Sequence, residues 1–331
     1  MGGREKIMNK PSLVINITDS CNFHCVYCPP YGENLCRSNL KYDVNAVKTL
    51  IDAAAEEDVR LIRFTGGEPL LEFDRLYELL SYTKGRFKRT VLNTNGFLLL
   101  KHLSELEEFK NFLTIKVSLD TFDKQEFQQI VGVDGYECVV EAIKKSVDSG
   151  FMVEINTVFI NQSVDTVFDI FDFAKSLRVD TKILTASNFY SKIDIGKRVR
   201  IGSLIDKIEK TYDREENSKL VTGLGASMLS YKNGSNHILI VDHSCENSHT
   251  PNKMYFESCK TDCNLYPCDF GVLSVTLSTD GILTPCRGRK DYGQCVFGKD
   301  ANTIKRAYMQ ALKYFESCCH INVNNSGDSF R

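Results

Sequence analysis

The chain lacks any long apolar run, and nothing in it approaches the ~18 consecutive apolar residues that a transmembrane helix needs. Its first ten residues, Met1 to Lys10, are polar and charged, without the apolar segment of a secretory signal. An excess of charge is also missing, because 41 basic residues stand against 43 acidic ones. No electrostatic argument therefore supports binding to nucleic acid or to a membrane, and we expect a cytoplasmic protein.

Cysteine is too sparse for a disulfide scaffold, at 13 of 331 residues. An odd number of cysteines in a cytoplasmic protein favours metal ligands over disulfides. Their distribution is uneven, with three between residues 21 and 28 and seven between residues 259 and 319. These two groups are the candidate metal sites.

Apolar, β-rich segments alternate with amphipathic helical patterns over about 190 residues, as in βαβ units with a parallel sheet. The expected strands are 13–18, 61–65, 90–93, 114–119, 153–159 and 181–184. The expected helices lie near 44–57, 73–82, 103–109, 136–149 and 166–177. Six repeats predict an α/β fold with a partial (β/α)6 TIM-type barrel, whose site lies at the carboxyl ends of the strands.

The rest of the chain divides by composition. We expect the barrel over 11–190, a connecting segment with one helix over 191–236, a small cysteine-rich annex over 237–320, and a disordered tail over 321–331. There is no internal repeat and no low-complexity tract.

The most informative motif is the C-x3-C-x2-C run of Cys21, Cys25 and Cys28, directly after the first expected strand. Three thiolates leave one iron of a [4Fe–4S] cluster open to a ligand that is not protein. A zinc site is the alternative, because C-x2-C also occurs in zinc ribbons. The run resembles the signature of the radical S-adenosylmethionine (SAM) superfamily, whose open iron chelates SAM. In that superfamily the reduced cluster cleaves SAM to a 5′-deoxyadenosyl radical.

A second motif, Gly66-Gly67-Glu68-Pro69, follows the second expected strand. Two glycines allow close approach of a ligand, and the carboxylate can accept hydrogen bonds from an amine. The motif resembles the superfamily element that holds the methionyl amino group of SAM. A strand-to-helix turn with proline at the helix start is the alternative.

Short polar side chains end the next two strands: Asn93 and Thr94 on one, Ser118 and Asp120 on the other. They can reach the ribose and the carboxylate of SAM, although turn and helix-cap roles are equally open for such residues. Together, the motifs are similar to the GTP 3′,8-cyclases of molybdenum-cofactor biosynthesis over roughly residues 12–290. This resemblance implies SAM contacts at Tyr27, Gly67 and Ser118. It also implies an electron donor such as flavodoxin or ferredoxin.

The annex contains a predicted hairpin between Cys268 and Cys286, with a turn at Asp280-Gly281. Cysteines at both ends of a hairpin arrive close together, as cluster ligands must. The pattern resembles SPASM and twitch domains, which implies one auxiliary [4Fe–4S] cluster, with Cys263 and Cys318 or Cys319 as further ligands. Buried free thiols or a structural zinc are the alternatives.

The resemblance to the cyclases breaks down where a triphosphate would bind. The first strand, Leu13 to Asn16, carries no basic residue, Glu154 stands where a lysine is usual, and Arg63 is the main basic residue retained. We expect Arg63, Asn93 and Glu154 to contact substrate, and Glu154 to favour a cationic or hydroxyl-rich one. No catalytic acid or base can be assigned; Tyr31, Cys36 and Glu154 are candidates.

The leading hypothesis is a radical SAM enzyme that abstracts hydrogen from a small molecule, leading to cyclisation, epimerisation, oxidation or rearrangement. A ribosomal-peptide maturase is the second hypothesis, although a first strand near residue 12 leaves little room for a preceding leader-binding domain. A divergent GTP cyclase and a non-enzymatic metal-binding protein are the others.

Overall fold

The computed structural model describes residues 11–28, 41–186, 199–215, 228–242, 252–264, 274–316 and 318–322. Its centre is a curved sheet in which six strands follow one another in sequence order, each parallel to the next. They are β1 (Ser12–Asn16), β3 (Leu61–Thr65), β4 (Arg89–Thr94), β5 (Leu113–Ser118), β6 (Met152–Phe159) and β7 (Asp180–Thr185). This order confirms the predicted partial barrel.

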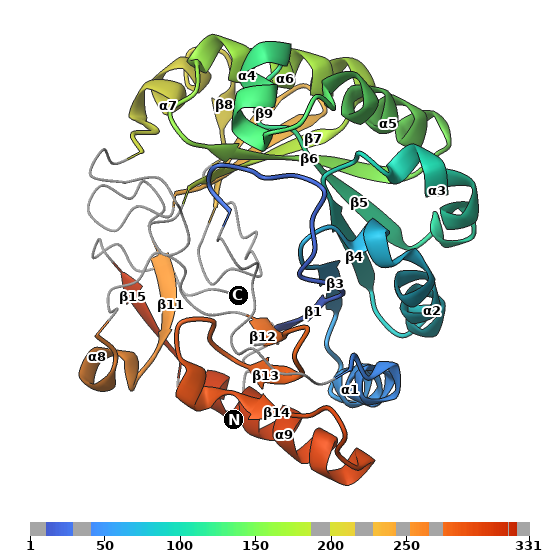
Figure 1. Ribbon diagram of the computed structural model, residues 1–331. Helices are drawn as coiled ribbons and strands as arrows, with labels where there is room; N and C mark the ends of the chain where they lie inside the picture. Colours follow the sequence, from blue (N-terminus) through green and yellow to red (C-terminus); the bar gives the residue numbers. More distant parts are fainter. Residues whose placement is uncertain are drawn as a thin grey trace, which may run out of the picture.

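Helices cover the outer, convex face of the sheet (Figure 1). Those between the barrel strands are α1 (Val44–Glu56), α2 (Phe73–Thr83), α3 (Leu99–Leu106), α4 (Lys124–Val131), α5 (Tyr136–Asp148) and α6 (Val164–Leu177). Each presents an apolar stripe to the sheet; in α1, Val47, Leu50 and Ile51 are fully buried. The Asp43 and Ser163 side chains cap the first turns of α1 and α6, which accounts for where these helices begin.

The sheet continues beyond the six predicted strands at both edges. Next to β1 lie β12 (Ser274–Leu277), β13 (Ile282–Thr284) and β14 (Gln294–Cys295). Next to β7 lie β10 (Asn236–Val241), β9 (Leu229–Asn233) and β8 (Asp213–Arg214). The strands β12 and β10 run parallel to their barrel neighbours, so both additions are part of one twelve-stranded sheet.

The predicted hairpin of the annex is present as β12 and β13, with Thr276 paired to Thr284 and Gly281 at φ 83° after the turn. A Cβ on Gly281 would lie 2.5 Å from the Phe297 ring, so glycine is required there by both conformation and space. The β9–β10 hairpin spans residue 236, where we placed a domain boundary. The short helix α7 (Gly202–Ile208) packs its Leu204 and Ile208 with this hairpin.

The last described elements lie in the lower part of the view in Figure 1, with α9 next to α1 and with α8, β11 and β15 at the left. They are β11 (Asn252–Phe256), α8 (Cys259–Asp262), α9 (Ala301–Glu316) and β15 (Cys318–Asn322), with β11 and β15 pairing as a separate antiparallel ribbon. Helix α9 lies along α1, where Lys305 contacts Glu56 at 2.6 Å. In the described part of the chain, no helix is both long and apolar enough to cross a membrane.

Candidate active site

The loop that carries the cysteines follows β1 and is held against the Gly-Gly loop that follows β3. The backbone N–H of Gly67 donates to the Thr18 carbonyl at 2.6 Å, and that of Glu68 donates to the Ser20 carbonyl at 2.8 Å. A Cβ on Gly66 or Gly67 would lie 2.2 Å or 2.1 Å from these same two carbonyl oxygens. The two motifs found in the sequence therefore form one backbone-paired unit, and both glycines are needed for the pairing.

None of the three thiols of the cysteine loop forms a disulfide, and the three lie near one another. A hydrogen bond from the Cys25 thiol to Cys28, followed by burial, raises the pKa of Cys25 well above its usual range. Burial raises the pKa of Cys21, and the nearby charge of Cys28 raises it further. The Phe23 N–H and the Asn95 amide donate to the Cys21 sulfur at 3.4 and 3.8 Å. Donors to sulfur stabilise a thiolate, as a cluster ligand requires.

Three clustered thiols with N–H donors fit an iron–sulfur cluster by the chemistry of the donor set. Within the described residues, no three His, Cys, Asp or Glu side chains converge on a point that a single metal ion would occupy. A four-iron cluster spreads its thiolates around a larger core than one zinc ion does.

The Glu68 carboxylate is fully buried and joins the Gly-Gly loop to the end of β4. One of its oxygens accepts from the Leu70 N–H at 3.0 Å and from the Thr94 hydroxyl at 2.8 Å; the other accepts from the Asn95 N–H at 2.7 Å. Burial raises the pKa of Glu68 to about 7 despite these donors. Glu68 and Thr94, both expected near SAM, are thus bonded to each other.

A second buried carboxylate, Asp120, ties the cysteine loop to the ends of β5 and β6. The Tyr27 hydroxyl donates to Asp120 Oδ2 at 2.6 Å, and the Val158 N–H donates to Oδ1 at 2.7 Å. Burial raises the pKa of Asp120 to about 6 and is also the main reason why the pKa of Tyr27 lies well above its usual range. The residues expected to contact SAM therefore surround the cysteine loop at the carboxyl ends of β3, β4 and β5.

Two rows of residues in register line the inner face of the barrel. The upper row contains Ser118, Asn156 and Lys182, which are paired neighbours on β5, β6 and β7. Paired residues point to the same face of a sheet, and neighbouring strands are about 4.8 Å apart, so Lys182 lies roughly 10 Å from Ser118. The lower row contains Asn93, Lys116 and Glu154. The expected substrate contacts Asn93 and Glu154 therefore lie one layer below Ser118.

Glu154 does not present a free negative charge. Its carboxylate contacts Lys116 Nζ at 2.5 Å and also pairs with the Arg89 guanidinium. Because two cations already compensate this carboxylate, the sequence-based expectation that Glu154 favours a cationic substrate loses its physical basis.

The inner face is instead rich in positive charge. Burial, and then the charges of Arg89 and Arg287, lower the pKa of Arg63 to about 10. Burial, and then the charges of Arg63 and Arg89, lower the pKa of Lys182 to about 7. Neither Lys182 nor Lys116 was expected at the site from the sequence. The signal for both was a lysine inside an expected strand of a buried sheet, because lysine is almost never fully buried unless it is paired.

In the annex, Arg289 connects the segments that carry Cys263 and Cys286. Its guanidinium bonds to the Cys263 sulfur and donates to the Asp262 carbonyl at 3.1 Å, while its backbone N–H donates to the Cys286 carbonyl at 3.3 Å. Both thiols are half-buried. Of the other expected auxiliary ligands, Cys268 lies outside the described residues, and Cys318 is described only by its backbone in β15. Tyr31 and Cys36 also lie outside the described residues.

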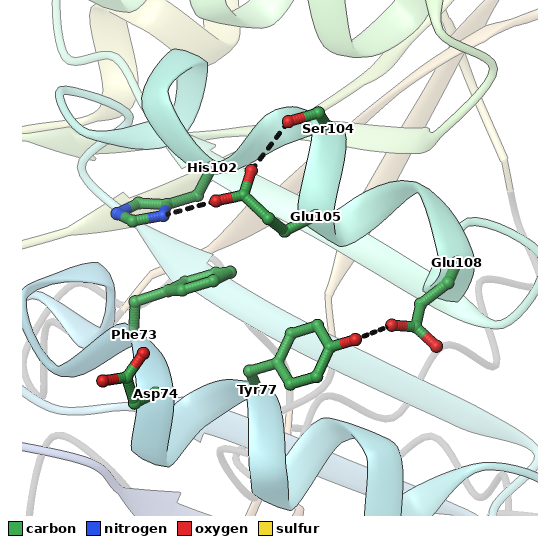
Figure 2. A pocket seen from close by; sticks show the side chains of 7 residues that line it. All are labelled: Phe73, Asp74, Tyr77, His102, Ser104, Glu105 and Glu108. Atoms are coloured by element: carbon green, nitrogen blue, oxygen red, sulfur yellow. Dashed lines mark hydrogen bonds and ion pairs between the residues drawn. The ribbon is translucent and has the colours of Figure 1, made fainter.

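A separate pocket of about 670 Å³ lies on the outside of the barrel between α2 and α3 (Figure 2). Its lining consists of Phe73, Asp74, Tyr77, His102, Ser104, Glu105 and Glu108. The His102 ring stacks on Phe73 at 3.9 Å, and its Nδ1 lies 3.6 Å from Glu105. None of the residues expected at the active site lines this pocket.

The fold and the cysteine loop together define the class of protein. Residues 15–174 match the family model of the radical SAM superfamily, and this span runs from β1 into α6. Residues 15–174 therefore form a radical SAM domain, and the chain is an enzyme. This domain implies a [4Fe–4S] cluster and SAM.

Curated relatives refine this assignment. The chain is 26% identical over 309 residues to a GTP 3′,8-cyclase of Helicobacter pylori (strain HPAG1), a match that covers 90% of this chain and 88% of the relative. It is 33% identical over 153 residues to a GTP 3′,8-cyclase of Vibrio cholerae (strain M66-2), covering 45% of each. The resemblance to this family, seen first in the motifs, is confirmed.

Solved structures show the same fold. Streptococcus suis SuiB bound to its precursor peptide SuiA superposes with a TM-score of 0.62 at 19% identity, over 91% of this chain and 65% of that chain. The anSMEcpe structure with bound AdoMet superposes with a TM-score of 0.57 at 16% identity, over 93% of this chain and 82% of that chain. The chain spans about two thirds of the length of SuiB.

Proposed function

We propose that this enzyme abstracts a hydrogen atom from a small-molecule substrate held inside the barrel, next to SAM bound at the cysteine loop. The backbone pairing of the cysteine loop with the Gly-Gly loop carries the proposal, since it brings the cluster ligands and the expected SAM contacts into one unit. Cys21, Cys25 and Cys28 would hold the cluster. When bound, the reduced cluster and SAM supply a 5′-deoxyadenosyl radical.

The chain's own residues orient these groups. Gly66 and Gly67 let their loop pair closely with the cysteine loop beside the expected SAM site, while the buried Glu68 fixes their loop to β4. Ser118 lies at the end of β5 as a candidate contact with SAM. The hydrogen bond between Tyr27 and Asp120 holds the cysteine loop over the barrel opening.

The test is anaerobic reconstitution with iron and sulfide, followed by incubation with SAM and a strong reductant. We expect 5′-deoxyadenosine from the wild-type enzyme and none from a variant with Cys21, Cys25 and Cys28 all changed to alanine. A Cys138→Ala variant is the matched control, because Cys138 lies on α5 and bonds to the Phe97 carbonyl. Absence of 5′-deoxyadenosine from cluster-loaded wild-type enzyme would refute the proposal.

An auxiliary cluster in the annex is part of the proposal, with Cys263 and Cys286 among its ligands. The link that Arg289 makes between their segments supports it. We expect the Cys263→Ala, Cys286→Ala double variant to retain about four of about eight irons per chain and still to cleave SAM. Unchanged iron content would remove the auxiliary cluster from the proposal.

Cyclisation of GTP is the second candidate, favoured by similarity to a named GTP 3′,8-cyclase over 90% of the chain. Incubation of the reconstituted enzyme with GTP, SAM and reductant tests it. Formation of a cyclised nucleotide would establish this reaction. Production of 5′-deoxyadenosine without nucleotide turnover would support a different small molecule.

A further inference from the structure

Asn95, in the turn after β4, joins the two loops of the candidate active site. Its backbone N–H donates to the Glu68 carboxylate at 2.7 Å, which ties it to the Gly-Gly loop. Its side-chain amide nitrogen donates to Asn22 Oδ1 at 2.8 Å and to the Cys21 sulfur at 3.8 Å, which ties it to the cysteine loop. The side chain therefore contacts an expected cluster ligand from outside the cysteine loop.

The orientation of the Asn95 amide is fixed by a further contact within its own turn. The Phe97 N–H donates to Asn95 Oδ1 at 3.0 Å, so the other end of the amide carries the two N–H groups. Asn22 Oδ1 and the Cys21 sulfur are the acceptors for these two groups. Asn95 therefore presents a donor, and not an acceptor, to Cys21.

A donor at this sulfur affects an iron–sulfur cluster that the loop would hold. Reduction adds one electron, and the thiolate ligands share the negative charge that it brings. N–H groups directed at a thiolate stabilise this charge, so they favour the reduced cluster and raise its reduction potential. The Phe23 N–H, at 3.4 Å from the Cys21 sulfur, is a backbone donor within the loop itself. Asn95 adds a side-chain donor from a neighbouring strand end.

We propose that Asn95 is a positioning residue of the cluster: its amide holds the Cys21 thiolate in place and makes the cluster easier to reduce. The inference rests on the proposed function, because it assumes that Cys21, Cys25 and Cys28 hold a cluster. Since SAM is cleaved only by the reduced cluster, this side chain would set the fraction of enzyme that can react at a given potential of the electron donor.

The variant Asn95→Ser separates the donor at Cys21 from the turn. A serine hydroxyl can still accept from the Phe97 N–H, but it is too short to replace the amide at the sulfur. The matched control is Asn233→Ser, which removes an amide that donates to the Thr211 carbonyl at 3.2 Å from the β9–β10 turn. That turn lies at the amino end of β7, opposite to the strand ends next to the cysteine loop.

The test is a redox titration of the reconstituted proteins, followed by electron paramagnetic resonance. The signal of the cysteine-loop cluster is recognised as the component that SAM shifts, and it is then titrated without SAM. At a fixed potential, we expect the ratio of reduced to oxidised cluster to be about tenfold lower in Asn95→Ser, which is a shift of about 59 mV to lower potential. Asn233→Ser should titrate as the wild-type enzyme does, and both variants should bind as much iron as the wild type.

Asn95→Asp is the second variant, should Asn95→Ser not take up the cluster. It keeps the acceptor for the Phe97 N–H and places a negative charge instead of a donor beside Cys21, so the potential should fall further. The inference is overturned if the cluster-loaded Asn95 variant titrates as the wild type does, or if Asn233→Ser shifts the potential by the same amount. A failure of the proposed function is recognised separately, because the wild-type enzyme would then form no 5′-deoxyadenosine.

Discussion

The Tyr27 hydroxyl donates a 2.6 Å hydrogen bond to the Asp120 carboxylate, which joins the cysteine loop to the strand ends of β5 and β6. Asp120 is 1% exposed and has few other donors, so the bond offsets part of the cost of burying its charge.

Tyr27→Phe should destabilise the reconstituted enzyme by about 1–3 kcal/mol, because a buried carboxylate loses its strongest donor. Urea unfolding measures the change. The matched control is Tyr82→Phe, which removes a 2.7 Å hydrogen bond to Asp52 near the surface. Equal losses of unfolding free energy in the two variants would show that the Tyr27 hydrogen bond stabilises the fold no more than one near the surface.

Gly67→Ala should abolish SAM binding, because its Cβ would lie 2.1 Å from the Ser20 carbonyl and separate the two loops. Gly202→Ala is the matched control, since nothing lies within 4 Å of a Cβ at that position. Equilibrium dialysis with labelled SAM measures the effect on cluster-loaded protein. Wild-type affinity in Gly67→Ala would contradict the loop pairing described above.

Glu154→Gln should destabilise the enzyme by roughly 3 kcal/mol, because it leaves the Lys116 ammonium buried beside other cations. The companion variant Glu78→Gln breaks the exposed pair with Lys48 and should cost about 0–1 kcal/mol. Adding Lys116→Met to Glu154→Gln should recover much of the stability. A double variant as unstable as the sum of the single ones would argue against coupling.

Lys182 should make stability depend on pH above neutrality. Its pKa is about 7 in the folded protein and 10.5 when unperturbed, so between these values the unfolded chain binds one more proton. The free energy of unfolding contributed by this group should therefore rise by about 1.4 kcal/mol per pH unit from pH 7 towards pH 10, and be flat below pH 7. Urea unfolding of wild type and Lys182→Met from pH 6 to 10 measures the difference, which should grow with pH in this window only.

Most of the barrel could be predicted from the sequence because its signals are local. Each strand, such as Leu61–Thr65, is a short apolar run before a polar end, and each helix has a regular apolar stripe. Helix α4 was missed because its eight residues include only three apolar ones, Phe127, Ile130 and Val131. The parallel pairing of β12 with β1, and of β10 with β7, was missed because pairing between distant segments leaves no local pattern.

The site divides in the same way. The cysteine run and the Gly-Gly motif were recognisable because several functional residues stand close together in the sequence. The charge of the interior was misjudged because it depends on which side chains meet across strands. In the sequence, Glu154 indicates a negative charge in the barrel. In the structure, Lys116 on the neighbouring strand compensates that charge.

The pairing of β1 with β12 has a consequence for how the enzyme is made. Ser12 lies in β1, the first described strand. Its partner Ser274 lies in β12, which is synthesised more than 250 residues later. During translation, the strand that leads into the cysteine loop therefore has one unpaired edge until the annex emerges. An exposed edge strand is prone to wrong pairing, and thiols without a bound cluster are prone to oxidation. Cluster insertion after the whole chain has folded would avoid both hazards.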